Sequence, residues 1–103
     1  MVEPLAEIRT YDDLHRALRE RADAINIPRM AIDELTGLAD GYSGKVLGQG
    51  KTKKLGPLSF GAMLAALGLK LLLVEDSEQT RRMRDRWEAR IRRCPNGDRK
   101  EAA

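Results

Sequence analysis

The chain has little of what disulfide-bonded, metal-binding and membrane proteins depend on. Its 103 residues include one cysteine and one histidine, and no apolar run approaches the length of a membrane span. The single cysteine, Cys94, cannot form an internal disulfide or a multi-cysteine zinc site. Residues 1–10 also lack the apolar core of a signal peptide. We therefore expect a cytoplasmic protein that binds no cofactor and no metal.

Arrangements for catalysis are scarce as well. His15 and Cys94 lie at opposite ends of the sequence, so no nucleophile and base pair is expected. We expect His15 to be a surface or a satisfied core histidine. Neighbouring carboxylates such as Asp12 and Asp13 fall where a helix should begin, and capping explains them. We expect no enzymatic activity.

Two segments of the chain partly match the motifs of a nucleotide-binding site. Residues 44–52 are similar to a phosphate-binding loop, and residues 71–76 to the strand that follows it with a magnesium-binding acid. The loop motif requires four residues between its glycines, whereas Gly44 and Gly50 enclose five. The residues before it also have a helical pattern where a strand is required. We interpret this stretch as a flexible basic loop.

Aromatic residues make up 4% of the chain, so the core must consist mostly of Leu, Ile, Ala and Met. That composition favours packed helices over a β-sandwich. We predict a mainly α fold, a compact helix-turn-helix bundle of about four to five helices with one short strand and a C-terminal helix. We divide the chain into a helix-turn-helix domain with a terminal strand (1–76), an Arg-rich helix (77–94) and a disordered tail (95–103).

Two helices of the bundle are marked by their ends. Thr10 and Asp13 form a capping-box pattern, and apolar residues then recur at helical spacing over residues 11–24. We expect Ser59 to cap a later helix that ends at Gly68.

The centre of the chain is residues 28–47, with the sequence PRMAIDELTGLADGYSGKVL. It predicts two short helices with a bend at Gly37, where glycine permits a positive φ. Asp40 is expected to cap the second helix, on which Tyr42 and Val46 share one face. This outline is a helix-turn-helix. Its outward face should consist of Asp40, Gly41, Gly44 and Lys45.

The charge changes sign inside this second helix. Residues 1–44 carry five arginines against nine acidic residues, whereas residues 45–76 carry five lysines against two and residues 77–103 nine basic residues against five. Phosphate contact therefore belongs on the C-terminal side. We expect Tyr42, Ser43 and Lys45 to contact bases or the groove, and Lys51, Lys53 and Lys54 to contact phosphate.

Residues 69–74, LKLLLV, have the pattern of a buried strand. A lone strand must pair with the N-terminal arm or with its copy in a second subunit, and the latter predicts a homodimer. Ser77 or Asp76 should cap the last helix, over about 78–93, which carries an apolar stripe among arginines. The arginines suit either a solvated face around a packed stripe, which we favour, or phosphate and RNA binding. The expected dimer interface is Leu69, Leu71, Leu73, Met83, Trp87 and Ile91.

Residues 14–69 resemble the Cro/repressor-like, or XRE-type, helix-turn-helix family. The resemblance is carried by IDELTGL in the second helix and bend, GYSGKVL as the recognition helix and SFGAMLAALGLKL as the closing helix. It implies sequence-specific binding of double-stranded DNA, commonly as a dimer. The strand-like tail is similar to that of antitoxin-type members, which imply a toxin partner.

We therefore expect a dimeric DNA-binding transcriptional regulator whose recognition helix enters the major groove. The residues expected at the DNA are Asp40, Gly41, Tyr42, Ser43, Gly44, Lys45, Lys51, Lys53 and Lys54. The rival hypothesis is a protein-interaction module or antitoxin-like subunit, in which the helix-turn-helix is a scaffold and the strand and last helix bind a partner.

Overall fold

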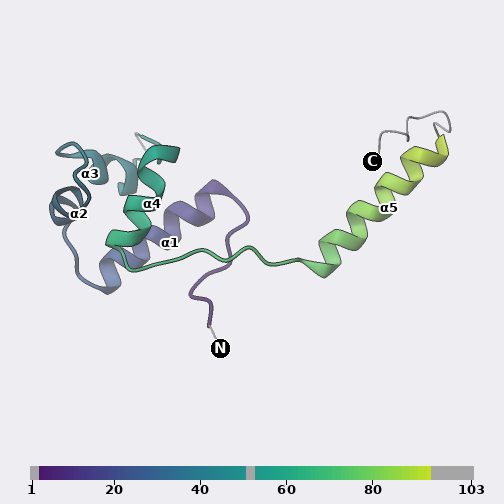
Figure 1. Ribbon diagram of the computed structural model, residues 1–103, viewed down its shortest axis with the longest axis horizontal. Coiled ribbons are helices and arrows are strands. Elements are labelled where there is room, and N and C mark those ends of the chain that lie inside the picture. Colours follow the sequence, from purple (N-terminus) through teal and green to yellow (C-terminus); the bar gives the residue numbers. More distant parts are fainter. Residues whose placement is uncertain (1–2, 51–52, 94–103) are drawn as a thin grey trace. The chain divides into compact units, whose positions relative to one another are not determined.

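The computed structural model describes residues 3–50 and 53–93, and it is mainly helical (Figure 1). The chain divides into two compact units, an N-terminal unit (residues 1–70) and a C-terminal unit (residues 71–103). The expected disordered tail, residues 95–103, lies outside the described residues. The described helices are α1 (Tyr11–Ala24), α2 (Arg29–Thr36), α3 (Tyr42–Leu47), α4 (Pro57–Ala66) and α5 (Ser77–Arg93).

Helix α1 begins with the predicted capping box. The Thr10 side chain accepts a hydrogen bond from the Asp13 backbone, and the Asp13 carboxylate accepts one from the Thr10 backbone. The backbone N–H of Arg9 also donates to this carboxylate and is the main reason why the pKa of Asp13 lies below its ordinary value. The stabilisation is therefore present above the pKa of the unfolded chain and is lost as the pH falls through the folded pKa.

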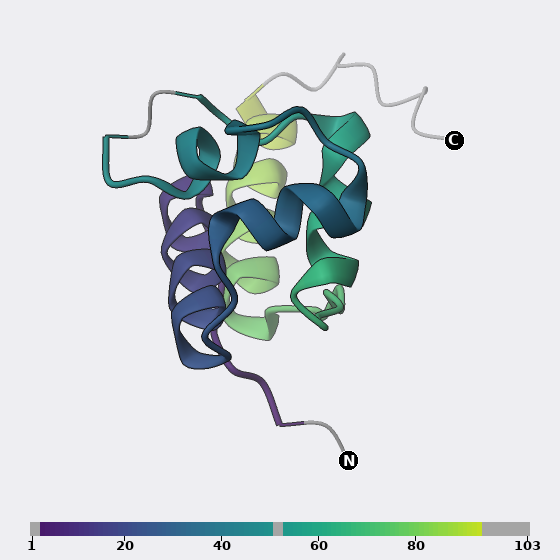
Figure 2. The same cartoon turned by 90° about the vertical axis from the view of Figure 1, so that its left-hand side faces the viewer.

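The core of the N-terminal unit lies between α1, α2, α3 and α4. Figure 2 looks onto α2, with α1 and α4 on either side of it. No aromatic residue is among the fully buried core residues of the described chain, as the low aromatic content predicts. The buried apolar residues are Leu18, Ala22, Ile32, Val46, Leu47, Met63 and Leu67.

Helix α4 begins earlier than expected and is tied to α1. Its first residue is Pro57 and its N-cap is Gly56, so the prediction that Ser59 is the cap was wrong. Proline suits a first helical position because its φ is already helical and its missing N–H would have no partner there. At the other end, the Nε of Arg21 donates to the Leu67 carbonyl at 2.9 Å, which satisfies one of the last carbonyls of the helix.

The predicted strand over residues 69–74 was also wrong, because no strand occurs in the described part of the chain. The Leu69 N–H bonds to the Leu64 carbonyl at the end of α4, and the Leu69 side chain packs against the core. Residues 71–74 then continue without regular structure, and all four side chains are exposed. A strand requires a second strand to pair with its backbone groups, and none lies among residues 3–50 or 53–93.

In the C-terminal unit, α5 begins as predicted. The Asp76 carboxylate accepts a hydrogen bond from the Gln79 backbone N–H at 3.1 Å, which is the geometry of an N-cap. Arginines on the first turns pair with Glu78, at 4.0 Å for Arg81 and 3.3 Å for Arg82. None of the helices in the described ranges is long and apolar enough to cross a membrane.

Candidate nucleic-acid interface

The α2–turn–α3 segment presents one face of α3 to solvent. Helix α2 ends at Gly37, which has the predicted left-handed backbone with φ of 75°. The buried residues of α3 are Ser43, Val46 and Leu47, which anchor its inner face. The predicted outward face is confirmed, because Asp40, Gly41, Gly44 and Lys45 are all exposed.

The N-terminus of α3 is held by a residue of α2. One carboxylate oxygen of Asp33 accepts hydrogen bonds from the backbone N–H and the hydroxyl of Ser43, at 3.0 and 2.6 Å. The other oxygen accepts the Gly41 N–H at 2.9 Å. Asp33 is 3% exposed, so these bonds lie in a region with little water. Asp33 therefore fixes the angle between α2 and α3.

This arrangement corrects the prediction that Asp40 caps α3. The N-cap position is Gly41, with a left-handed φ of 84°, and its side chain has no capping oxygen. Asp33 supplies the carboxylate from outside the helix, eight residues before Gly41 and ten before Ser43. Capping motifs involve residues within a few positions of the start of the helix, so they do not predict a cap from Asp33. Its one signal is that an acid stands at a core-facing position of the amphipathic helix α2.

Two residues expected at the DNA have other roles. Ser43 is 0% exposed and its hydroxyl is bonded to Asp33, so its assignment as a base contact is corrected. Tyr42 packs partly against the core, and its hydroxyl accepts the Gly56 N–H at 3.3 Å. We therefore assign Tyr42 to positioning the loop that precedes α4.

Two tyrosines hold the lysine-rich loop against the helices. The Tyr11 hydroxyl on α1 accepts the Leu55 N–H at 2.7 Å, and the Lys54 amine lies 5.9 Å from the centre of the Tyr11 ring. The Lys53 amine lies 5.6 Å from the centre of the Tyr42 ring on α3. Each cation is thus placed over an aromatic face, a favourable arrangement. The third expected phosphate contact, Lys51, lies outside the described residues.

We expect Tyr11→Phe to loosen this loop. The change removes the hydroxyl that accepts the Leu55 N–H but keeps the ring under Lys54. The unfolding free energy should fall by about 1 kcal/mol. The Leu55 amide should exchange faster with solvent in hydrogen-exchange NMR, while the Ala22 amide inside α1 keeps its protection. Unchanged Leu55 exchange would mean that Tyr11 does not hold the loop.

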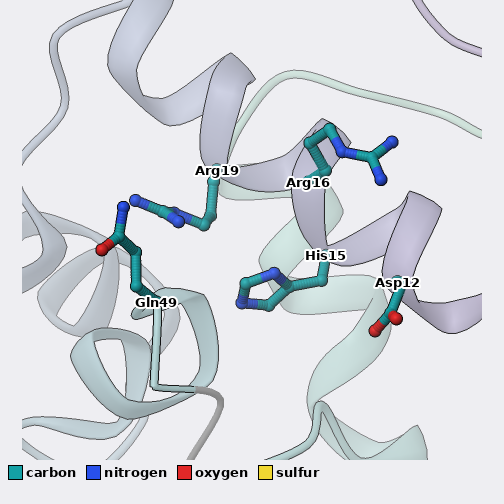
Figure 3. A pocket seen from close by; sticks show the side chains of 5 residues that line it. All are labelled: Asp12, His15, Arg16, Arg19 and Gln49. Carbon is teal, nitrogen blue, oxygen red and sulfur yellow. The ribbon is translucent and has the colours of Figure 1, made fainter.

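A solvent-open hollow of about 370 Å³ lies beside α1, lined by Asp12, His15, Arg16, Arg19 and Gln49 (Figure 3). Its histidine is the satisfied residue that the sequence predicts, since His15 is buried and its Nε2 lies 3.0 Å from the Gly48 carbonyl. The Arg19 guanidinium extends toward the Gln49 amide, and its Nε is buried without a partner in the described chain. The contact between His15 and Gly48 ties α1 to the end of α3. No group of three potential metal ligands occurs in residues 3–50 and 53–93.

The residues expected at a dimer interface divide between the two units. Leu69 packs against the core of the N-terminal unit. The other five belong to the C-terminal unit and are exposed in the isolated chain. They are Leu71, Leu73, Met83, Trp87 and Ile91.

Three features of the structure bear on function: the outward face of α3, the lysine loop that follows it in the chain, and the exposed apolar side chains of the C-terminal unit. Comparisons of the chain with protein-family models, with curated proteins and with solved structures found no match.

Proposed function

We propose that this protein is a non-enzymatic transcriptional regulator that binds double-stranded DNA through α3. The observation that carries the proposal is that α3 has two distinct faces. Gly44 and Lys45 are exposed on its outward face, while Val46 and Leu47 are buried on its inner face. An α-helix with its side chains is about 10–12 Å in diameter, and the major groove is about 12 Å wide, so the groove can receive α3. The helix can therefore enter the groove without displacing the core.

The residues on and after the outward face of α3 would make different kinds of DNA contact. Gly41 and Gly44 carry no side chain, so the α3 backbone can approach DNA closely. Lys45 can donate to guanine, and Asp40 can accept from the cytosine amine. Lys53 and Lys54 follow the helix as positive charges for the phosphates, a contact that is independent of sequence.

The regulator acts as a homodimer in this proposal. Residues 71–74 are four consecutive apolar residues, and Leu73 is fully exposed. A contiguous exposed apolar segment of this kind is unfavourable in water and is typical of an interaction site. Burial of Leu71 and Leu73 against a second copy would cover it, and two copies would place two α3 helices on one operator.

The loop lysines give the test of DNA contact. We expect Lys53→Ala/Lys54→Ala to weaken binding to all DNA sequences about equally. The slope of log K against log salt should fall by about 2, since each phosphate contact contributes about 0.9. Fluorescence anisotropy with labelled genomic duplexes between 50 and 200 mM salt measures both quantities. The same reasoning extends to Lys51.

Lys70→Ala is the matched control. Lys70 is exposed and follows the C-terminal end of α4, whereas the loop precedes its N-terminal end about 15 Å away. The control should leave the salt slope unchanged. An unaltered slope in the double variant would remove the loop from the interface.

A protein-interaction module is the second candidate, and the exposed apolar residues of the C-terminal unit favour it. In this case the helix-turn-helix is a scaffold, and a partner such as a toxin covers the C-terminal unit. Gel shifts with random genomic fragments at low salt, run beside analytical ultracentrifugation, separate the two candidates. DNA binding supports the regulator, whereas a dimer that binds no fragment supports the interaction module.

A further inference from the structure

Helix α5 carries an apolar stripe that nothing else in the described part of the C-terminal unit covers. Met83, Trp87 and Ile91 are spaced four residues apart and are 52%, 56% and 38% exposed. At 100° per residue they fall within an arc of about 80° and extend over about 12 Å. Most of the stability of a helix in a protein comes from packing of its apolar face, so α5 needs a partner for this stripe.

Arginines border the stripe on both sides. Arg84 and Arg90 stand three residues before and after Trp87, which places them about 60° to either side of it on the helix. The guanidinium of Arg90 lies 5.4 Å from the centre of the Trp87 ring, so this charge is held at the edge of the stripe. No ion pair involves Arg84 or Arg90 among the described side chains.

The three acidic residues of α5 lie farther from the centre of the stripe than Arg84 and Arg90. Glu78 and Asp85 are about 180° and 160° from Trp87, and Glu78 pairs with Arg81 and Arg82. Glu88 is about 100° from Trp87, outside Arg84. The charged residues nearest the stripe are therefore arginines, so its borders are positive.

This charge pattern disfavours a second copy of α5 as the partner. Both borders are arginine, so two stripes that meet in a parallel or an antiparallel pair bring arginines opposite arginines. Like charges across a helix pair are destabilising, and acidic residues at these border positions normally set the pairing. A lipid surface is also disfavoured, because the stripe is narrow, as in a helix–helix seam, and interfacial helices bury a broad apolar face.

We propose that the α5 stripe binds a helix of another protein whose apolar seam is flanked by aspartate and glutamate. Arg84 and Arg90 would pair with the partner's carboxylates, for which the guanidinium is the better cation because it binds them in a bidentate manner. Met83, Trp87 and Ile91 thereby move from the expected homodimer interface to a heteromeric one. The inference is independent of DNA binding and of the pairing through Leu71 and Leu73.

The test uses the full chain, because Trp87 is the only tryptophan and reports directly on the stripe. The probe is a synthetic 21-residue helical peptide without tryptophan, with leucines at the seam and glutamates at its borders. A second peptide of the same length has lysines at the borders. The glutamate peptide should shift Trp87 emission to shorter wavelengths saturably, weaken with salt, and bind about tenfold or more tightly than the lysine peptide.

A pair of charge-reversal variants locates the contact. Arg84→Glu/Arg90→Glu should invert the preference, so that the lysine peptide binds more tightly. Arg81→Glu/Arg82→Glu makes the same change of charge on the far face and should keep the preference for the glutamate peptide. Far-UV circular dichroism should give the same helix content for both variants.

Each other outcome overturns the proposal. No shift with the glutamate peptide, or equal effects of the two double variants, would show that the stripe does not select an acidic helix. A blue shift of the protein alone that grows with concentration and with salt would assign the stripe to a second copy. A shift with anionic vesicles or duplex DNA but not with the peptide would assign it to lipid or to nucleic acid.

Discussion

Asp33→Ala should lower the unfolding free energy of the N-terminal unit by about 2–4 kcal/mol. The change leaves the Gly41 N–H, the Ser43 N–H and the Ser43 hydroxyl without their acceptor. Each buried donor without a partner costs about 1–3 kcal/mol, and water can reach the exposed Gly41 and reduce the total. For a unit of this size, Tm should fall by about 8–30 °C.

Urea and thermal unfolding followed by far-UV circular dichroism measure the change. Tryptophan fluorescence would not, because Trp87 lies in the other unit. Asp33→Asn should have about half the effect, since its oxygen can still serve Ser43 while its amide faces the Gly41 N–H as a second donor. The DNA affinity of both variants should fall with the order of α3.

Glu34→Ala is the matched control for Asp33→Ala. Glu34 is the next residue of α2, carries the same charge and is exposed. Its loss should change the unfolding free energy by less than about 0.5 kcal/mol. Equal stability of the Asp33→Ala and Glu34→Ala variants would mean that Asp33 does not hold α3.

The parts of the fold that the sequence predicts correctly are set by residues close together in the chain. Thr10 and Asp13 are three residues apart, and α1 has the predicted bounds. Gly37 ends α2 because glycine takes a left-handed φ without strain. The inward and outward faces of α3 follow from the spacing of Val46 and Leu47 against Gly44 and Lys45.

The predictions that were wrong concern residues whose structure depends on a partner far away in the sequence, or on one that is not found in the described part of the chain. The LKLLLV segment has the composition of a strand, but strand formation depends on a second strand. The sequence predicts that Ser43 is exposed because it is polar. In the structure, both of its donors bond to Asp33, ten residues earlier, and Ser43 is buried. The role of Tyr42 likewise depends on a distant partner, because its hydroxyl accepts the N–H of Gly56, fourteen residues later. Local patterns therefore place the helices, whereas contacts between the helices decide which side chains remain exposed on α3.

Gly44→Glu should abolish most DNA binding without destabilising the fold. Nothing lies within 4 Å of a β-carbon built at Gly44, and the residue is exposed within α3. Glutamate is also a better helix former than glycine by roughly 0.5–1 kcal/mol. The new carboxylate would project from the outward face toward the DNA phosphates, so the affinity should fall about tenfold or more.

Gly61→Glu supplies a control with the same chemistry. Gly61 is exposed within α4, and nothing lies within 4 Å of a β-carbon built there. The change adds the same charge and the same helix propensity to the same unit, away from α3. It should therefore reproduce any general effect of a lower net charge on DNA binding.

The most direct measurement is a titration of labelled genomic duplex at 50 mM salt with the Gly44→Glu and Gly61→Glu proteins side by side. If α3 enters the groove, the Gly44→Glu protein loses about tenfold or more in affinity relative to Gly61→Glu, while both melt at or above the temperature of the parent chain. Equal affinities of the two variants would contradict the central claim that DNA meets the outward face of α3.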